Sequence, residues 1–145
     1  MKLNVPIKIL NEDATLPTYG SEYSAGADLY SIEACEISPH ETMLVHTGVA
    51  LQIPDGYVGL IYARSGLATK RSLAPANKVG VIDSDYRGEI MVSLHNHSNV
   101  VQSIEKGERV AQIVFTQYAT AEFNVLDELT KTDRDDGGFG STGTK

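Results

Sequence analysis

The feature that most constrains the fold is a period-two alternation of apolar and other side chains in the middle of the chain. Residues 43–53 alternate in this way, which places successive side chains on two faces of one extended strand. The turn sequence Pro54-Asp-Gly56 follows, and residues 57–62 are typical of the returning strand. Residues 89–95 and 109–118 repeat the pattern after glycine-containing turns. One face of the long strand would carry Met43, Val45, Thr47, Val49, Leu51 and Ile53, and the other Leu44, His46, Gly48, Ala50 and Gln52.

Residues 65–74 are the stretch with helical character. Ser65 can cap the helix, and Leu67, Ala68, Arg71 and Leu73 are spaced for one buried side. Thirteen glycines fall largely at the junctions between strands, which fits a closed or sandwiched β architecture better than an open sheet with long edges. The sequence therefore predicts an all-β fold with one short helix.

Length and charge limit the domain organisation and the partners. At 145 residues, the chain suits a single domain, 1–145, in which apolar residues thin out after position 126 and leave 127–145 as a flexible C-terminal arm. A formal net charge of −7 argues against a general affinity for nucleic acid or anionic membranes. Any phosphate ligand would have to be met by local cations.

Cysteine and histidine usage argues against a resident metal site and for a reducing compartment. Cys35 is the single cysteine and cannot form an intramolecular disulfide. His95 and His97 share a strand face but lack a third ligand. The N-terminus has no apolar signal region, and no window approaches eighteen consecutive apolar residues. We therefore expect a soluble, cytoplasmic protein.

The C-terminal tail carries groups that suit a flat anionic ligand. Its glycines let backbone N–H groups approach phosphate oxygens, and Ser141 and Thr142 add hydroxyl donors. Arg134 adds a charge that can bind in bidentate fashion, and Phe139 adds a stacking face. This inventory suits a nucleoside polyphosphate, although the same composition would also build a solvated terminus.

Two further segments combine polar chemistry with a structural transition. The sequence Arg64-Ser65-Gly66 places a cation and a hydroxyl where a strand meets a helix start, with its unpaired N–H groups. The alternative is a capped helix with a solvent-exposed arginine. Asp83 follows two apolar residues and is a candidate general base. The alternative is that residues 83–85 are simply the turn of a β-hairpin.

Two polar residues remain ambiguous by themselves. Asp28 stands at the start of an expected strand, where a turn or edge charge is the ordinary role. Gln112 would lie on one strand face with Val110 and Val114, opposite Ala111, and would need a hydrogen-bond partner if buried. A bond to neighbouring backbone is the ordinary role for such a side chain.

Five segments, in this order and at this spacing, closely resemble the motifs of the trimeric deoxyuridine triphosphate nucleotidohydrolases, the dUTPases. They are AGADL at 25–29, RSGLA at 64–68, the pattern N-x-x-G-x-I-D-x-D-Y-R-G at 77–88, GERVAQIVF at 107–115 and GGFGSTG at 137–143. The resemblance implies a distorted jelly-roll-like β-barrel of the β-clip type. It also implies a homotrimer whose active sites are assembled from three chains, with no nucleic-acid or membrane partner.

The implied reaction is hydrolysis of dUTP to dUMP and pyrophosphate by attack of water on the α-phosphorus. This reaction limits uracil in DNA and supplies dUMP for thymidylate synthesis. Carried over residue by residue, Asp83 would be the general base and would contact the 3′-hydroxyl. Tyr86 would pack beneath the sugar and exclude a 2′-hydroxyl. Backbone from Asn77 to Val81 would pair with the uracil edge, and Gly80 would allow the close approach that excludes a 5-methyl group.

The same resemblance assigns the phosphate contacts. Arg64, Ser65 and Gly66 would hold the α- and β-phosphates, with Gln112 nearby. Mg²⁺ would be chelated mainly by the phosphates and by water, with Asp28 acting through a water molecule. The arm would close on the γ-phosphate and the base through Arg134, Phe139, Gly140, Ser141 and Thr142.

Two positions depart from the family pattern. Asp135 stands where the family usually has glycine, and Ala63 stands where proline or glycine is common. The carboxylate of Asp135 would weaken closure of the arm by repelling the γ-phosphate.

Two other functions compete with the dUTPase interpretation. One is a dCTP deaminase of the same fold, which uses a glutamate at the base, and the other is a non-catalytic nucleotide-binding regulatory module.

Overall fold

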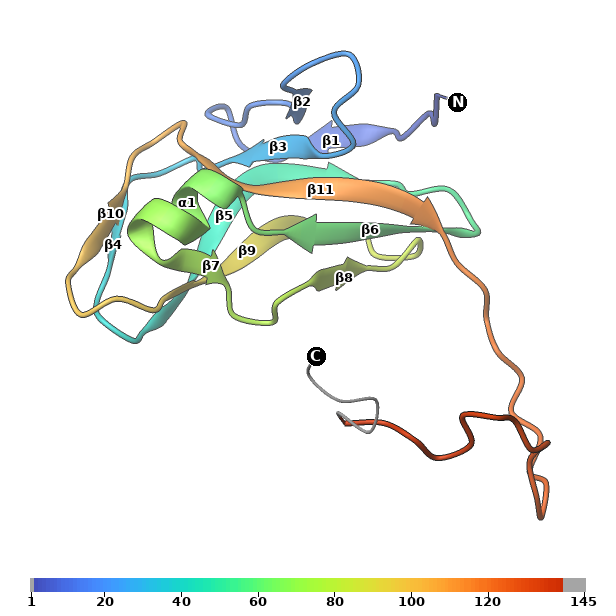
Figure 1. Ribbon diagram of the computed structural model, residues 1–145. Coiled ribbons are helices and arrows are strands. Elements are labelled where there is room, and N and C mark those ends of the chain that lie inside the picture. The colour runs from blue at the N-terminus through green and yellow to red at the C-terminus, as the bar shows by residue number, and fades with distance from the viewer. Residues whose placement is uncertain (1, 140–145) are drawn as a thin grey trace.

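Two antiparallel sheets form most of the protein in a computed structural model that describes residues 2–139 (Figure 1). The first sheet has the order β1-β5-β9-β7, and the second has the order β2-β3-β11-β6-β8. A two-stranded ribbon joins β10 to β4. The first sheet comprises β1 (Ile7–Ile9), β5 (Thr42–Leu51), β9 (Glu89–Asn96) and β7 (Leu73–Pro75). The second comprises β2 (Thr18–Tyr19), β3 (Ala27–Tyr30), β11 (Arg109–Gln117), β6 (Tyr57–Tyr62) and β8 (Gly80–Ile82), and the ribbon comprises β4 (Cys35–Ile37) and β10 (Gln102–Ile104).

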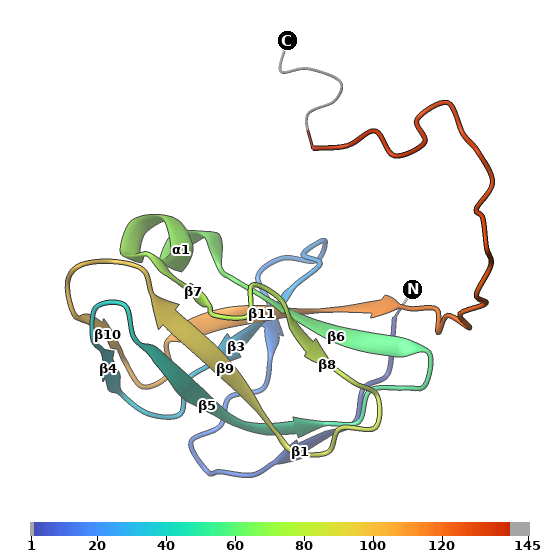
Figure 2. The ribbon, with the colours of Figure 1, turned by 90° about the horizontal axis from the view of Figure 1, so that it is seen from below.

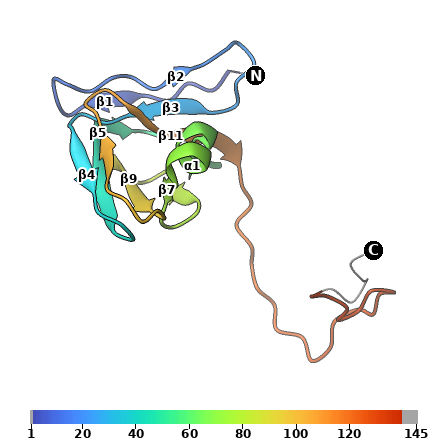
Figure 3. The same ribbon diagram turned by 60° about the vertical axis from the view of Figure 1, so that its left-hand side comes forward.

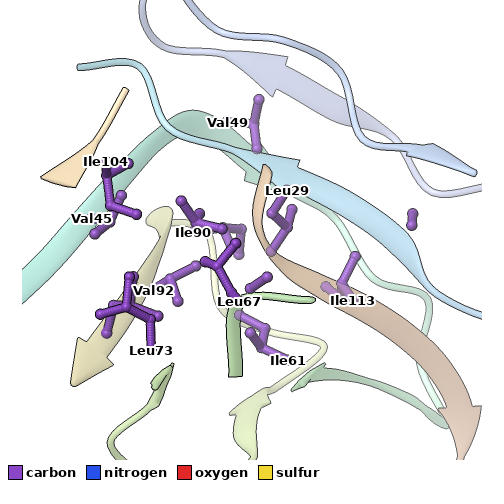
Figure 4. Packing of buried hydrophobic residues seen from close by; sticks show 14 of the residues in the cluster. Leu29, Val45, Val49, Ile61, Leu67, Leu73, Ile90, Val92, Ile104 and Ile113 are labelled. Carbon is purple, nitrogen blue, oxygen red and sulfur yellow. The ribbon is translucent and has the colours of Figure 1, made fainter. Parts of the chain in front are cut away.

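The core lies where the inward faces of the two sheets meet (Figure 4). The first sheet contributes aliphatic side chains from β5 and β9, and the second contributes them from β3, β6 and β11. Burial of this aliphatic surface is the main stabilising contribution to the fold. The fully buried aliphatic residues of these strands include Val45, Val49, Ile90, Val92, Leu94, Leu29, Val110 and Ile113.

The long strand has the predicted apolar face, but its other face is also covered beyond a bulge in β5. A register shift between His46 and Ala50 marks a bulge in its pairing with β9, and Gly48 sits there with φ +69°. A side chain at Gly48 would meet the Cβ of Ala14 at 2.9 Å. Beyond the bulge Ala50 is buried as well as Val49, because both faces are covered. The predicted apolar face is confirmed beyond the bulge, because Thr47, Val49, Leu51 and Ile53 are all buried. The expectation of a half-buried strand is wrong at Gly48 and Ala50, which are buried on the other face.

The helix is shorter than the sequence predicted. Helix α1 spans Ser65–Arg71 and ends at Ser72, which adopts the left-handed conformation with φ +54°. Leu73 then enters β7 and is fully buried there, so only Leu67 faces the core from α1. The N-cap residue is Arg64 and no side chain caps it, so the predicted capping role of Ser65 is wrong. The helix packs beside β7 at one end of the sheets (Figures 1 and 3).

The last described residues form an extended arm. Beyond β11, the amide of Tyr118 donates to Gly56 O at 3.2 Å, and residues 119–136 are exposed throughout. Figures 1 and 2 both show this segment running away from the two sheets. The boundary of the arm at residue 127 stays a prediction. Over residues 2–139, the protein has no helix long and apolar enough to cross a membrane.

Candidate active site

Three of the motif segments meet in one pocket on the outer face of the second sheet. This pocket, which we call the Asp28 pocket, has a volume of about 470 Å³. Its charged wall consists of Asp28, Arg64 and Arg109, so its formal charge is positive. Ser65 and Gln112 also line it, as predicted from the phosphate-binding motifs, whereas Gly66 does not. The remaining lining residues are Gly20, Ser24, Ala25, Gly26, Tyr62 and Val114.

Asp28 is held between two guanidinium groups. Arg64 donates from Nε to Oδ1 of Asp28 at 2.7 Å, and Arg109 donates from Nη1 to Oδ2 at 3.3 Å. The Asp28 side chain is only 12% exposed, whereas that of Arg109 is 51% exposed. Asp28 is therefore a largely buried carboxylate with paired charges, not the edge charge that its strand position suggested.

Gln112 is fixed to the backbone that precedes the helix. Its Nε2 donates to Ala63 O at 2.9 Å, which confirms the predicted bond to neighbouring backbone. A Cβ at Gly26 would lie 2.4 Å from Oε1 of Gln112, so a larger residue there would displace this side chain. The glycine of the AGADL segment thus makes room for the glutamine of the GERVAQIVF segment.

Arg109 lies in a predicted motif, but the sequence analysis gave it no role in the site. In its pairing with β3, strand β11 has a register shift between Arg109 and Ala111. The shift buries both Val110 and Ala111 and places Arg109 in the same pocket as Gln112. Strict alternation instead put Val110 with Gln112, and that assignment is wrong. The turn at Gly107 is a common setting for a bulge, but the alternation of apolar residues does not indicate at which residue the bulge lies.

The motif at 77–88 forms a second pocket, which we call the Asp83 pocket. It has a volume of about 300 Å³. The five predicted residues Asn77, Gly80, Val81, Asp83 and Tyr86 all line it. Glu89 and the outward residues of β5 and β9 also line this pocket. The sequence analysis did not predict that these residues belong to it. They include Leu44, Met91 and Ser93.

Glycines set the shape of the Asp83 pocket at two points. A Cβ at Gly80 would lie 3.2 Å from the Cβ of Ile61 and 3.4 Å from Nδ2 of Asn77, so β8 approaches β6 closely. The hydroxyl of Tyr86 donates to Glu89 O at 3.0 Å. A Cβ at Gly88 would lie 2.4 Å from that hydroxyl oxygen. The bare backbone at Gly88 therefore lets the Tyr86 ring lie against the segment that leads into β9.

Asp83 presents a free carboxylate to its pocket. Residues 83–86 form a turn in which the amide of Tyr86 donates to Asp83 O at 3.2 Å. The predicted β-hairpin is wrong, because β8 pairs with β6 and β9 pairs with β5 and β7. The Asp83 side chain is exposed and has no hydrogen-bond or ion-pair partner within residues 2–139. Arg87 nearby donates to the carbonyl oxygens of Ser84 and Tyr86 and not to Asp83. The Asp83 carboxylate is available to accept a proton.

Glu89 is in contrast fully engaged at the bulge of β5. Its Oε2 pairs with Nδ1 of His46 at 2.9 Å, and its Oε1 accepts from the amide of Gly48 at 2.8 Å. The hydrogen bond to Glu89 raises the pKa of His46. For Glu89, burial alone would raise the pKa, but the hydrogen bonds from His46 and Gly48 outweigh it and lower the pKa. These hydrogen bonds keep Glu89 in its carboxylate form and stabilise the bulge of β5.

The two pockets open on opposite faces of one strand. Ile61 lines the Asp83 pocket and its neighbour Tyr62 lines the Asp28 pocket. Successive residues of a strand point to opposite faces, so β6 separates the two groups of predicted residues. The structure thus brings the phosphate-motif residues together and the residues of the Asp83 pocket together, but it does not bring the two groups together within one chain.

The described arm residues contribute to neither pocket. The side chain of Arg134 folds back on its own turn, where Nε donates to Gly137 O at 2.9 Å. Asp135 adopts φ +46°, a left-handed conformation that suits glycine, and Phe139 is exposed. The predicted site residues Gly140, Ser141 and Thr142 lie outside the described residues.

Metal-binding side chains are sparse in the described chain. Residues 2–139 contain no group of three histidine, cysteine, aspartate or glutamate residues that could hold an ion. His95 and His97 stack edge to face at a centroid distance of 4.4 Å.

Burial, together with the charges of Glu33 and Glu108, raises the pKa of the Cys35 thiol, so the thiol is the resting form of this side chain.

Comparisons with known proteins agree with this arrangement of motifs. The family model described as dUTPase matches residues 12–143. A deoxyuridine 5′-triphosphate nucleotidohydrolase from Nautilia profundicola is 48% identical over 141 residues, which cover 97% of this chain and 99% of the relative. The enzyme of the same name from Cronobacter sakazakii is 43% identical over 152 residues, which cover 100% of both chains.

Solved structures share the fold. A mutant dUTPase of Staphylococcus bacteriophage 80alpha, solved with dUpNHpp, gives a TM-score of 0.91 at 29% identity and covers 98% of this chain and 99% of its own. A mutant dUTPase of phage phi11 of S. aureus, described with a coordinated structural Mg(II) ion, gives a TM-score of 0.82 at 26% identity. It covers 89% of this chain and 100% of its own. These likenesses confirm the predicted mostly β fold, and the chain belongs to the dUTPase family.

Proposed function

We propose that this chain is a dUTP diphosphatase, which hydrolyses dUTP to dUMP and pyrophosphate. The observation that carries the proposal is the pairing of a cationic pocket with a second pocket that holds a free carboxylate. The Asp28 pocket supplies guanidinium and amide donors for phosphate oxygens. The Asp83 pocket supplies backbone for a base edge, an aromatic ring for a sugar and an unpaired acid.

In the proposed reaction, Asp83 accepts a proton from a water molecule as the water oxygen bonds to the α-phosphorus. The bond from that phosphorus to the α,β-bridging oxygen breaks, and pyrophosphate leaves with the electron pair. Positioning by Arg64, Ser65 and Gln112 supplies most of the rate enhancement, because these donors face oxygens whose charge grows during the reaction. Tyr86 would exclude a 2′-hydroxyl, and the close backbone at Gly80 would exclude a 5-methyl group.

Mg²⁺ fits this site as an ion carried by the substrate. The residues described here offer no cage of several carboxylates, but an ion chelated by three phosphates needs few protein ligands. Asp28 is the single acid of its pocket, and its oxygens keep lone pairs for a water molecule beyond those used by the arginines. When bound, the ion would neutralise charge on the phosphates. The phi11 dUTPase, with its Mg(II) ion, supports the choice of metal.

We further propose a homotrimer with active sites shared between chains. The position of the two pockets on opposite faces of β6 supports this, because one dUTP molecule would have to reach around the strand to touch both in a single chain. The arm residues up to 139 line neither pocket of their own chain, which supports it as well. In the assembled site, Arg134, Phe139, Gly140, Ser141 and Thr142 would close over the nucleotide. Symmetric closed assemblies are the usual form of soluble oligomers.

A cytoplasmic location is part of the same proposal. The lone thiol of Cys35 suits a reducing compartment, and the relatives from Nautilia profundicola and Cronobacter sakazakii are bacterial.

A deaminase acting on dCTP is disfavoured by the state of Glu89. It is the one glutamate that lines either pocket, and both of its oxygens are engaged by His46 and Gly48. Activation of water at a base would require a glutamate with a free oxygen.

The test is pyrophosphate release from dUTP, dCTP, dTTP and UTP with Mg²⁺, using the wild-type chain and Asp83→Asn. We expect selective cleavage of dUTP and a loss of about 10²- to 10⁴-fold in kcat for Asp83→Asn, because the general base is removed. Asp85→Asn, in the same exposed turn, is the matched control and should keep its activity. Equal rates for all four nucleotides, or an active Asp83→Asn, would contradict the assignment. Ammonia release from dCTP would indicate the deaminase, and nucleotide binding without turnover would indicate a regulatory module.

A further inference from the structure

Arg64 uses the Nε edge of its guanidinium group for Asp28, so a phosphate that binds this edge in bidentate fashion must displace the carboxylate. In the structure, its Nε donates to Oδ1 of Asp28 at 2.7 Å. Under the proposed function, the same guanidinium must turn its donors toward phosphate oxygens. A triphosphate entering the Asp28 pocket therefore competes with Asp28 for Arg64.

Release of Arg64 has an energetic cost that depends on what remains beside Asp28. The Asp28 side chain is 12% exposed, and it is the single acid of the pocket. A largely buried carboxylate that loses its counter-charge is strongly destabilised. Arg64 could leave only if another cation stays with Asp28.

Arg109 is placed to be that cation. Its Nη1 lies 3.3 Å from Oδ2 of Asp28, on the carboxylate oxygen that Arg64 does not use. Its backbone is anchored beside β3, because Ser31 accepts from the amide of Gly107 at 2.8 Å and donates its own amide to Glu108 O at 2.9 Å. The bulge between Arg109 and Ala111 then places the side chain in the pocket.

We propose that Arg109 is a positioning residue, which stays paired with the Asp28 carboxylate and holds it in place so that Arg64 can move from Asp28 to the triphosphate. This inference rests on the proposed function. It explains why the pocket holds two arginines around one aspartate although phosphate binding alone would need no acid. It also separates the roles of the arginines: Arg64 touches the substrate, and Arg109 acts through Asp28.

The experiment measures affinity for a non-hydrolysable α,β-imido analogue of dUTP by calorimetry in EDTA, which removes any contribution of Mg²⁺ at Asp28. Turnover of dUTP with Mg²⁺ is measured in parallel. For Arg109→Gln we expect Kd and KM to rise on the order of tenfold with kcat within about twofold, because the Asp83 pocket is untouched. Arg109→Lys should restore most of the affinity, since it returns the charge.

Lys106→Gln is the matched control. It removes one positive charge three residues away, from an ion pair of 2.6 Å with Asp13 that lies outside both pockets, and should leave Kd unchanged. The deciding comparison is made in an Asp28→Asn background, where no carboxylate needs a counter-charge. There Arg109→Gln should change Kd by less than about twofold.

An Arg109→Gln variant that binds the analogue as tightly as wild type would overturn the inference. An equal loss of affinity in the Asp28→Asn background would also overturn it, because Arg109 would then bind the phosphates directly. A fall in kcat together with a lower melting temperature would indicate a purely structural role and contradict the inference. A wild-type chain that fails to bind the analogue would overturn the proposed function and this inference with it, whereas the preceding outcomes overturn the inference alone.

Discussion

Asp135 has a left-handed backbone conformation where the family pattern has glycine. It adopts φ +46°, and its amide donates to Oγ1 of Thr132 at 3.0 Å. This conformation costs aspartate more than glycine but less than most residues, and the charge of Asp135 stands next to Arg134, the proposed γ-phosphate ligand.

Asp135→Gly should therefore lower the KM for dUTP by about two- to fivefold with little change in kcat, since strain and repulsion together are worth about 0.5–1 kcal/mol. Steady-state kinetics at constant ionic strength would measure this. Asp136→Gly removes the same charge from a residue without a positive φ. An unchanged KM for Asp135→Gly would sink the idea, and an equal fall for Asp136→Gly would assign the effect to charge alone.

Gly88 determines the position of Tyr86, the residue proposed to select the sugar. An alanine Cβ there would lie 2.4 Å from the hydroxyl oxygen of Tyr86 and would displace the ring from its bond to Glu89 O. Gly88→Ala should reduce the ratio of kcat/KM for dUTP over UTP by about tenfold or more.

Tyr86→Phe is the comparison for Gly88→Ala, because it removes the hydroxyl group but keeps the ring. It should retain most of the discrimination between dUTP and UTP if shape decides the selection. If Gly88→Ala leaves the ratio of kcat/KM for dUTP over UTP unchanged, Tyr86 does not discriminate between the two sugars.

Individual residues differ in how far the sequence could place them. Asn77, Gly80 and Asp83 were placed in one pocket by a motif whose members are close in sequence. Arg109 and Glu89 were not, because their places depend on a bulge and on a strand pairing with residues 43 positions away. Long-range register has no local sequence pattern to reveal it.

At the scale of elements, the bulge of β5 is held by an ion pair with a definite pH dependence. The pKa of His46 is raised above 6.5 and that of Glu89 is lowered below 4.5 in the folded protein. The His46 contribution to stability is complete below pH 6.5 and is lost as pH rises through the folded pKa. The Glu89 contribution is complete above pH 4.5 and is lost as pH falls through its folded pKa.

The difference in free energy of unfolding between wild type and His46→Gln should therefore be greatest near pH 5.5 and should shrink toward pH 8. We expect a maximum of about 0.5–1 kcal/mol, because the imidazole is 42% exposed and water screens the pair. Urea denaturation at the two pH values measures this difference. A difference that does not vary with pH would mean that the pair contributes packing and not charge.

The elements themselves were largely predictable. The bounds of β6 match the predicted 57–62, and β9 and β11 differ from prediction by one residue at one end. The helix was overextended because Leu73 fits a helical spacing as well as it fits a strand, and Ser72 stops the helix by turning left-handed. Serine has no general preference for that conformation, so the sequence did not indicate the stop.

At the scale of the whole molecule, the opposite placement of the two pockets makes a mixing experiment decisive. Arg64→Gln damages the Asp28 pocket and Asp83→Asn damages the other. Each variant alone should be nearly inactive. Trimers that contain both, isolated through two different tags after co-expression, should regain about a third of wild-type activity, because one site in three joins two intact pockets.

Mixed oligomers without activity would place both halves of each site in one chain and contradict the shared-site proposal. Separately purified variants, combined only in the assay without subunit exchange, are the control and should stay inactive.

Under the shared-site proposal, the separation of the pockets by β6 also makes catalysis depend on chain concentration. A lone chain would keep its sheets, its core and both half-sites, yet neither half would perform the reaction without a neighbour. Dilution below the dissociation constant of the assembly would then stop turnover without unfolding the chains. Activity per chain would be low at small chain concentrations and would rise steeply once the concentration passed that constant. The enzyme's own abundance would thereby set when dUTP begins to be removed.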